Sequence, residues 1–400
     1  MECRRLALIF QGTVNTDARV RREVESISKF AKIDVFSTDV RSEDGQFFNN
    51  NVKLVQFKLL DTWFNRNFFF GKQFSEVQKL IDPMQYDSLI CIDYPTLKIG
   101  VELKKKNPKL KLIYDSHEIY VETINQFFPR NGWKSLYGIP MTVINKLYHR
   151  GKEKKLVSHV DICVTVCDSL KWHFEKIWNK PVFVLKNCPD LESLGKLPLR
   201  NNPYIEEYGC VESDKILLYQ GDINPGRGLF HLINSMAVLP SEYKLFILGS
   251  GMSKNELVQL KLTLSLQNVF FIDRLPYDQL FNYTRHSHLG ISLIEPINLS
   301  KKLSLPNKLF EYMYGGVPFL ASNLPEPNNL LKQSDAGYIC PNFEIQSIKK
   351  SIEQVFANAE LYKLKSENAR NSIINLLNWT TEFDLLMKEI NTNLSNSYLQ

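Results

Sequence analysis

The amino-acid sequence predicts an α/β protein made of two doubly wound domains that follow each other along the chain. Short apolar runs alternate with longer amphipathic ones through most of the 400 residues, which favours parallel sheets covered by helices on both faces. The alternation is interrupted from Asn187 to about Asp214 by a polar stretch that contains proline and glycine, and it then resumes. We therefore expect a first domain at residues 1–190, a linker at 191–213, a second domain at 214–378 and a final helical segment at 379–400.

Seven short apolar runs of the first domain are expected to be buried strands. They are Leu6–Phe10, Ile33–Ser37, Val52–Phe57, Ser88–Ile92, Leu110–Tyr114, Asp161–Val166 and Val182–Leu185. Between the first two, Ala18–Phe30 carries apolar residues at helical spacing and is expected to be a helix with Asp17 as its N-cap. Arg19, Arg21 and Arg22 in this helix are consistent with a solvated face.

The second domain repeats the pattern, with helices expected between five strands. The strands are Lys215–Gln220, Lys244–Leu248, Val269–Ile272, Leu289–Ile294 and Phe319–Ser322. The chain closes with helical segments at Glu344–Ala357, Ala359–Leu377 and Thr380–Leu394. Ligands of such sheets bind beyond the carboxyl ends of the strands, and with two domains the cleft between them is the default site.

The most informative segment is Ser304–Ser322, which reads as a brief helix followed by an apolar strand. Pro306 suits the first helical turn, and Gly315-Gly316 suits the end of the helix. Lys308 and Glu311 lie three residues apart near the N-terminus. A helix N-terminus attracts anions, while a carboxylate can accept hydrogen bonds from a sugar or ribose hydroxyl. The segment therefore predicts an anion site beside a hydroxyl-binding carboxylate.

Two glycine-containing loops follow strands of the second domain. In Gly221-Asp-Ile-Asn-Pro-Gly-Arg-Gly228 the backbone N–H groups can approach phosphate oxygens, and Arg227 adds a planar cation. An ordinary turn with a solvated arginine fits the same spacing equally well. Gly249-Ser-Gly251 lacks the third glycine of a dinucleotide fingerprint and is expected to be a tight turn unless it faces the same cleft.

A histidine stands at the end of one strand of the first domain, in Asp115-Ser-His-Glu118. At that position His117 can bind an acceptor or shuttle a proton. The alternative, favoured for the motif taken alone, is a histidine satisfied by Asp115 or by backbone.

Two aromatic stretches of the first domain, Trp63–Phe70 and Phe127–Trp133, suit a membrane interface or a lipid-linked acceptor. The second of them leads into Leu136–Tyr148 and the basic residues 149–155, and a basic cluster favours an anionic surface. Burial of these aromatic side chains within the first domain is the more frequent outcome for such stretches.

Composition narrows the class of protein. A hydrophobic content of 44% and a charged content of 23% are ordinary for a globular protein. The net charge of +6 is mild and no aromatic RNA-binding motif occurs, so nucleic-acid binding is disfavoured. Seven scattered cysteines favour reduced core thiols over disulfides or zinc, which fits a cytoplasmic location. No apolar run reaches the length of a membrane-spanning helix, so any membrane contact is expected to be peripheral, on the inner face of the cell membrane.

These segments together resemble the retaining, nucleotide-sugar-dependent glycosyltransferases of family four, also called glycosyl transferases group 1. The resemblance covers nearly the whole chain, and its most specific part is Leu305–Met313 with Gly316-Val-Pro318, which matches the family's donor-binding helix. Its other parts are Asp17–Glu23, Tyr114–Glu118, Val164–Ser169, Pro181–Asn187, Tyr219–Gly221, Pro225–Gly228 and Trp379. The resemblance implies the GT-B fold, in which two Rossmann-like domains face each other across a cleft and the final helix packs back towards the N-terminal domain.

The resemblance also implies roles for the candidate residues. The nucleotide-sugar donor would bind to the second domain, with Glu311 on the ribose and with Arg227 and Lys308 on the diphosphate. The full donor set would be Gly221, Gly226, Arg227, Gly249, Gly251, Asn307, Lys308, Leu309 and Glu311. The acceptor side would hold Gly12, Asn15, Asp115 and His117. The catalytic set would be His117, Arg227, Lys308 and Glu311, with no metal ion and no further cofactor.

The sequence departs from the family pattern at two positions. Leu303 stands eight residues before Glu311, in the region where many members carry a first glutamate that contacts the donor sugar. Asp222 follows the loop glycine where many members carry arginine, so Arg227 would have to provide more of the contacts to the diphosphate. Lys301, Lys302, Glu295 or Asn298 are the candidates to replace the missing glutamate.

The function that these observations predict is a metal-independent hexosyltransferase. It would move a sugar, with retention of configuration, from a nucleotide-diphosphate donor to a hydroxyl of a glycan or lipid-linked acceptor in surface polysaccharide biosynthesis. Two alternatives stay open, both with the same fold. One is a catalytically silent nucleotide-sugar-binding subunit of another transferase, and the other is a sugar-nucleotide epimerase.

Overall fold

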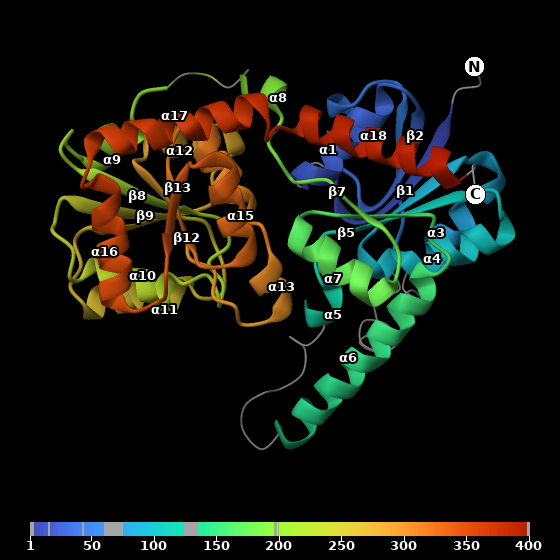
Figure 1. Cartoon of the computed structure of the whole chain (residues 1–400), viewed down its shortest axis with the longest axis horizontal. Coiled ribbons are helices and arrows are strands. Elements are labelled where there is room, and N and C mark those ends of the chain that lie inside the picture. The colour runs from blue at the N-terminus through green and yellow to red at the C-terminus, as the bar shows by residue number, and fades with distance from the viewer. Residues whose placement is uncertain are drawn as a thin grey trace. The chain divides into compact units, whose positions relative to one another are not determined.

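The computed structural model describes residues 4–14, 17–41, 44–59, 75–123, 135–195, 198 and 200–397 (Figure 1). The chain forms two compact units. Unit 1 comprises Met1–Lys186 together with Phe383–Gln400, and unit 2 comprises Asn187–Glu382. Each unit is built around its own parallel sheet and is described by itself.

Unit 1 contains a seven-stranded parallel sheet in the order β3-β2-β1-β4-β5-β6-β7. Its strands are β1 (Arg5–Thr13), β2 (Lys32–Asp39), β3 (Val52–Gln56), β4 (Ser88–Ile92), β5 (Lys111–Ser116), β6 (Ile162–Thr165) and β7 (Val182–Val184). All seven fall on the runs expected from the sequence. The order of strands reverses between β1 and β4, and at such a switch point ligands bind beyond the carboxyl ends of the strands.

Helices cover both faces of this sheet (Figure 1). They are α1 (Ala18–Ser28), η1 (Asp44–Phe47), α3 (Ser75–Leu80), η3 (Pro83–Gln85), α4 (Asp93–Lys106), α5 (Tyr120–Thr123), α6 (Ser135–Val157) and α7 (Asp168–Trp178). The last helix, α18 (Trp379–Ser397), lies from Phe383 onward in unit 1. Asp17 caps α1 by accepting from the N–H groups of Arg19 and Val20, as the sequence predicts.

Unit 2 contains a six-stranded parallel sheet in the order β10-β9-β8-β11-β12-β13. Its strands are β8 (Lys215–Gln220), β9 (Tyr243–Leu248), β10 (Val269–Ile272), β11 (Leu289–Ser292), β12 (Phe319–Ser322) and β13 (Gly337–Cys340). The sequence predicts five of these strands and misses β13. This strand begins at a glycine and is followed directly by Pro341, so only three apolar residues mark it in the sequence.

The helices of unit 2 pack against both faces of the sheet. They are α8 (Leu191–Gly195), α9 (Pro203–Tyr208), α10 (Leu229–Met236), α11 (Lys254–Thr263), α12 (Tyr277–His286), α13 (Leu299–Leu303), α14 (Asn307–Tyr314), α15 (Pro325–Ser334), α16 (Ile345–Phe356) and α17 (Ala359–Asn375). Alternate residues of β8 point to opposite faces. Leu217 and Tyr219 join one buried core with α10 and α16, while Ile216 and Leu218 join a second core with α14 and α17.

The segment expected to be a linker, 191–213, is instead part of unit 2. Tyr204 of α9 is fully buried and its ring packs edge-on against Phe246 of β9. Its hydroxyl donates to the carbonyl oxygen of Tyr283 at 2.8 Å. Cys210 is also buried in the same core. The polar composition misled the prediction because one aromatic side chain fixes the segment to the unit. The change of unit falls at Lys186–Asn187 instead.

Tyr312 fixes helix α14 to the sheet of unit 2. Its buried hydroxyl lies 3.1 Å from the carbonyl oxygen of Leu218 and 3.2 Å from that of Ile291, and it accepts from the N–H of Gln220 at 3.3 Å. The ring reaches this position because Gly290 has no side chain, since a Cβ there would lie 2.2 Å from the ring. The interaction holds α14 across β8 and β11, next to the switch point of this sheet.

We predict that Tyr312→Phe lowers the free energy of unfolding of unit 2 by about 1–3 kcal/mol, because it leaves buried backbone groups without this partner. The measurement is denaturant unfolding of the full chain. Tyr314→Phe on the same helix is the control, because the ring of Tyr314 is only partly buried. Equal stability of the two variants would contradict the role given to the Tyr312 hydroxyl.

Candidate functional site

The loop after β8 is shaped by glycines and by one carboxylate. Gly228 has a φ of 68°, and a Cβ at this position would lie 2.2 Å from the carbonyl oxygen of Leu293. Glu295 holds the loop because its Oε1 accepts from the N–H of Gly228 at 3.0 Å. Its own N–H donates to the carbonyl oxygen of Gly226 at 3.1 Å. Glu295, a candidate for the missing sugar-binding carboxylate, therefore supports the loop in this structure.

Lys308 is a buried cation at the start of α14. Its side chain is 9% exposed and its Nζ lies 3.6 Å from the centre of the Tyr219 ring. Within the described residues, this Nζ has no hydrogen-bond partner. Desolvation by burial, followed by the nearby Arg227 cation, lowers the pKa of the Lys308 ammonium well below its ordinary value. A buried ammonium without an acceptor is costly, and an anion beside it would relieve that cost.

Arg227 approaches the same place from the glycine loop. Its Nε is buried and, among the residues that the structure describes, finds no acceptor. After burial, the positive charge of Arg227 contributes most to the lowered pKa of the Lys308 ammonium. The side chains of Lys308 and Arg227 thus lie close together, and each has a buried N–H group that finds no acceptor among the described residues. Buried polar groups are normally hydrogen-bonded, so this arrangement indicates a site for a strong anionic acceptor.

Glu311 lies one helical turn beyond Lys308 and is oriented by two side chains. The Gln220 amide donates from Nε2 to Oε2 of Glu311. Oε1 of Gln220 in turn accepts from the hydroxyl of Thr284 at 2.8 Å. Gln220 ends β8 and Thr284 lies in α12, so three elements of unit 2 fix this carboxylate. It faces the pocket as a hydrogen-bond acceptor of defined direction.

These groups line one pocket of about 400 Å³ at the carboxyl end of the unit 2 sheet. Its lining is Gln220, Gly221, Asp222, Arg227, Leu280, Lys301, Ser304, Leu305, Pro306, Asn307, Lys308 and Glu311. A second pocket of about 280 Å³ shares Gly221, Asp222 and Leu280 with it. Gly249, Asp273, Arg274 and Leu275 belong to that second pocket, together with Leu248. The two hollows therefore adjoin and can hold one elongated ligand.

Five of the nine predicted donor residues line the first pocket, namely Gly221, Arg227, Asn307, Lys308 and Glu311. A sixth, Gly249, lines the second pocket. The other three, Leu309, Gly226 and Gly251, lie outside both linings. The Leu309 side chain is fully buried in the core because that face of α14 is turned to the sheet. Gly226 packs against Ile297, and Gly251 against the backbone of Ile223.

The two departures from the family pattern have defined surroundings. Asp222 pairs with Arg274 at 2.5 Å, and the side chains are 46% and 69% exposed, so the pair contributes little to stability. Leu303 ends the short helix α13, which Asn298 caps by accepting from the N–H of Lys301. Of the four proposed replacements for the missing glutamate, Lys301 lines the pocket.

A second polar cluster lies in unit 1, at the carboxyl ends of β4 and β5. Arg19 is 3% exposed and forms a bidentate pair with Asp115, its Nη2 lying 2.9 and 3.1 Å from the two carboxylate oxygens. Its Nη1 donates to the carbonyl oxygen of Leu185. His117 Nε2 lies 2.9 Å from Oδ2 of Asp115, and Asp93 accepts from the backbone N–H of His117 at 2.9 Å. Through Arg19 the cluster ties α1 to β5 and to the residue that follows β7.

The protonation of this cluster follows from its charges. Burial alone would lower the pKa of His117, but the Asp115 and Asp93 carboxylates outweigh it and raise the pKa to about 9. Burial alone would raise the pKa of Asp115, but the Arg19 and His117 cations hold it below its ordinary value. A pKa of about 9 favours the protonated His117 ring at neutral pH, with Nε2 donating to Asp115. The same Nε2 lies 2.9 Å from Nε of Arg19, a second cation that faces this carboxylate. The His117 side chain is 18% exposed, so it still reaches solvent.

Sequence reasoning missed Arg19, Glu23 and Asp93 in this cluster. Arg19 was expected on a solvated face, and the structure corrects this. Arg19 and Glu23 lie four residues apart, next to Val20 and Val24 on the buried side of α1. That spacing was the available signal, since a charged pair beside buried valines needs partners. Asp93 has a left-handed backbone conformation with a φ of 59°, which no sequence pattern predicted.

The remaining predicted residues of the first domain are placed as follows. Gly12 lies near the end of β1, and its N–H donates to the hydroxyl oxygen of Thr38 at 2.9 Å. Asn15 and the aromatic stretches Trp63–Phe70 and Phe127–Trp133 lie outside the described residues. The arrangement in which His117 faces the donor pocket of unit 2 stays a prediction.

No group of three or more His, Cys, Asp or Glu side chains in the described part of the chain is arranged to hold a metal ion. No helix among those same residues is both long and apolar enough to cross a lipid bilayer.

Comparisons with known proteins show what this chain is similar to. Residues 202–372 match the family model described as glycosyl transferases group 1. The N-acetyl-alpha-D-glucosaminyl L-malate synthase of Bacillus anthracis is 25% identical over 171 residues, which cover 42% of this chain and 43% of that protein. An uncharacterized glycosyltransferase of Haemophilus influenzae is 28% identical over 300 residues, which cover 74% of each protein. The match thus spans less than half of the first relative and about three quarters of the second.

A solved structure has the same fold over the whole chain. It is that of Anabaena Alr3699/HepE in complex with UDP and glucose, with a TM-score of 0.74 and 12% identity. The likeness covers 97% of this chain and 100% of that one. At this level of identity it shows the fold alone, and it confirms two Rossmann-like α/β domains.

We predict that the His117 imidazole titrates near pH 9 in the folded protein, above the ordinary value of about 6.5. The raised pKa means that the charged ring stabilises the fold fully below pH 6.5, and that this contribution is lost as the pH rises through about 9. The measurement is an NMR titration of the imidazole resonances, assigned by their loss in His117→Gln. A midpoint at or below 6.5 would show that the two carboxylates do not hold the proton.

Proposed function

We propose that this chain, which has the GT-B fold and carries a glycosyl transferases group 1 domain at residues 202–372, is a glycosyltransferase that uses a nucleotide-diphosphate sugar. The observation that carries the proposal is the convergence of Lys308 and Arg227, two cationic side chains with buried, unsatisfied N–H groups, in one pocket. A diphosphate supplies several anionic oxygen acceptors, which suit both the compact ammonium of Lys308 and the planar guanidinium of Arg227.

The pocket suggests how the donor is held. The diphosphate would lie between Lys308 and Arg227, at the N-terminus of α14 and near the glycine loop. Glu311, fixed by Gln220, would accept hydrogen bonds from the ribose hydroxyls. The base would occupy the adjoining pocket beside Arg274 and Leu275. The UDP in the Anabaena structure supports a donor of this class.

The same two cations would assist the chemistry. When the bond between the sugar and the diphosphate breaks, negative charge develops on the leaving phosphate. Lys308 and Arg227 would stabilise that charge, because fixed cations that are already in place act strongly on charge that develops beside them. We propose on this basis that transfer needs no metal ion. Retention of configuration and a hexose donor follow from the family resemblance, as finer parts of the proposal.

His117 is the candidate group on the acceptor side. As an imidazolium held by Asp115, it can donate a hydrogen bond from Nδ1 to a sugar hydroxyl or to the transferred sugar. Gly12 lies near the carboxyl end of β1, which β4 separates from β5 in the same sheet. The acceptor that we propose is a glycan or lipid-linked hydroxyl in surface polysaccharide biosynthesis, at the cytoplasmic side of the membrane.

A second candidate is a silent nucleotide-sugar-binding subunit, favoured by Leu303 and Asp222, which replace two residues that many transferases carry. A sugar-nucleotide epimerase of the same fold is a third. Incubation of the purified chain with a panel of nucleotide sugars separates them. A transferase hydrolyses one donor slowly to free sugar and nucleoside diphosphate, whereas an epimerase yields an isomeric nucleotide sugar. Binding of a donor with neither hydrolysis nor transfer would overturn the enzyme proposal.

We predict that Arg227→Ala weakens the binding of nucleoside diphosphates by about 1.5–3 kcal/mol, as expected for the loss of charge-assisted hydrogen bonds. Isothermal titration calorimetry with UDP and GDP measures this change. Arg200→Ala is the matched control, because Arg200 lies in unit 2 and its side chain is exposed. Unchanged affinity in the Arg227 variant would exclude it from the diphosphate site.

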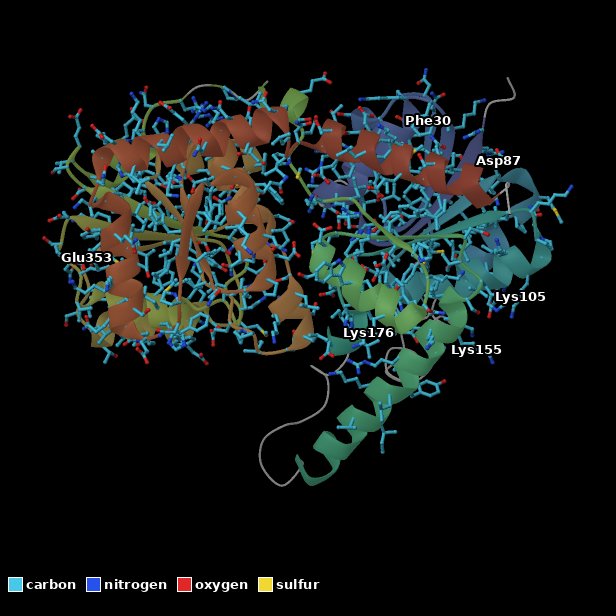
Figure 2. The ribbon with its side chains drawn as sticks, in the orientation of Figure 1. Phe30, Asp87, Lys105, Lys155, Lys176 and Glu353 are labelled. Carbon is cyan, nitrogen blue, oxygen red and sulfur yellow. The ribbon has the colours of Figure 1, made fainter. Side chains whose placement is uncertain are left out.

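Peripheral membrane contact through unit 1 is a further part of the proposal. Helix α6 projects from the sheet of its unit (Figure 1) and exposes Val143, Ile144, Leu147 and Tyr148 on adjacent turns. Lys152 lies 5.8 Å from the Tyr148 ring, and Lys155, labelled in Figure 2, follows near the end of the helix. An apolar stripe bordered by lysines suits the surface of an anionic bilayer.

We predict that the double variant Ile144→Ser/Leu147→Ser loses about tenfold or more of its partition onto vesicles of anionic phospholipid. The reason is that two apolar side chains no longer enter the bilayer surface. Co-sedimentation measures the partition, and Met252→Ser, at an exposed position of unit 2, is the control. Equal partition of all three proteins, or none by the wild type, would contradict contact through α6.

A further inference from the structure

Unit 1 contains a cavity that is separate from the donor pocket. It has a volume of about 320 Å³ and lies between one face of the sheet and the helices α1 and α18. Its lining is mostly apolar and includes Ile27, Ile90, Ile113, Val164, Leu386 and Ile390. Ligand sites of proteins have this size and character, with a few polar groups that fix the orientation.

The cavity is a slot that follows the direction of the strands. Lys111, Ile113 and Asp115 alternate along β5 and all line it, so it extends over the four residue-to-residue steps from Lys111 to Asp115. At a rise of about 3.3 Å per residue, this corresponds to a length of about 13 Å. Its amino end is polar, with Arg4 and Asp87 in the lining, and Asp87 and Phe30 are labelled in Figure 2.

Helix α18 forms the outer wall of the slot. Phe383, Leu386, Met387 and Ile390 line it at helical spacing, so one apolar face of α18 is turned towards the sheet. Leu386 is buried, but the other three are only partly buried. The wall is therefore apolar without being closely packed, in contrast to the interior of a well-filled core. Leu385, on another face of α18, is 51% exposed.

The inner end of the slot carries a polar atom without a partner. Glu23 is 6% exposed and lines the cavity, and within the described residues its Oε2 has no hydrogen-bond partner. Burial, and next the Asp115 carboxylate, raise the pKa of Glu23 to about 8. The carboxyl group is therefore largely uncharged at neutral pH and can exchange hydrogen bonds with a neutral hydroxyl. The neighbouring Arg19, His117 and Asp115 charges are already paired with one another.

We propose that the slot beneath α18 binds a linear, uncharged amphiphile whose hydrocarbon body lies along the sheet and whose terminal hydroxyl hydrogen-bonds to Glu23. The apolar lining takes the chain, and the unpartnered carboxyl oxygen takes the hydroxyl. A charged head group is disfavoured, because burying one more charge beside this cluster costs more than its contacts return.

Isothermal titration calorimetry of the full chain with three soluble probes tests the proposal. 1-Octanol is expected to bind saturably at one site. Heptyl methyl ether, of similar length but without a hydroxyl hydrogen, and octanoate, which is charged, are each expected to bind at least tenfold more weakly. Absence of saturable octanol binding would overturn the site. Equal affinity for octanol and the ether would overturn the role of Glu23.

Variants locate the binding. Met387→Trp fills the slot and is expected to weaken octanol at least tenfold, whereas Leu385→Trp on the exposed face leaves it unchanged. Ile390→Phe provides a second, smaller obstruction should the tryptophan variant fail to fold. Glu23→Met keeps the length of the side chain and is expected to abolish the preference for octanol over the ether. Octanol binding that survives both obstructing variants would contradict the assignment.

Discussion

The candidate donor site depends on a buried cation that the protein itself leaves without an acceptor. Lys308 is placed against the Tyr219 ring and beside Arg227, and nothing among the described residues accepts from its Nζ. Burying an ammonium without an acceptor costs free energy, and the same burial lowers its pKa. The cost is understandable where an anionic ligand completes the site, because strained or unsatisfied groups persist mainly at functional positions.

The surrounding fold serves to hold that cation in place. Tyr312 fixes α14 to β8 and β11, Glu295 holds the glycine loop, and the Gln220 amide orients Glu311. Each of these contacts comes from a different element of unit 2, and each lies at the carboxyl end of its sheet. Cation, loop and carboxylate are therefore held by contacts within unit 2, and such preorganisation lowers the ordering cost of binding a ligand.

Much of this could be predicted from the sequence, because it rests on local patterns. The twelve expected strands follow from apolar periodicity, and Pro306 with Gly315-Gly316 places α14 to within a residue. Arg19 could not be placed in the same way, since its burial depends on Asp115, which lies 96 residues further along the chain. The burial of Tyr204 could not be predicted for a similar reason, because its partners Phe246 and Tyr283 belong to distant elements. Leu309 was expected to face the donor because motif position alone does not say which side of a helix meets the sheet.

The central claim is that Lys308 and Arg227 form a diphosphate site, and inorganic pyrophosphate tests it without knowledge of the base or the sugar. Calorimetric titration of the full chain should show one saturable site. Lys308→Met should weaken it at least tenfold with little loss of thermal stability, while Lys332→Met, at an exposed position of α15, should leave it unchanged. Equal pyrophosphate affinity in the wild type and in the Lys308 variant would contradict the account.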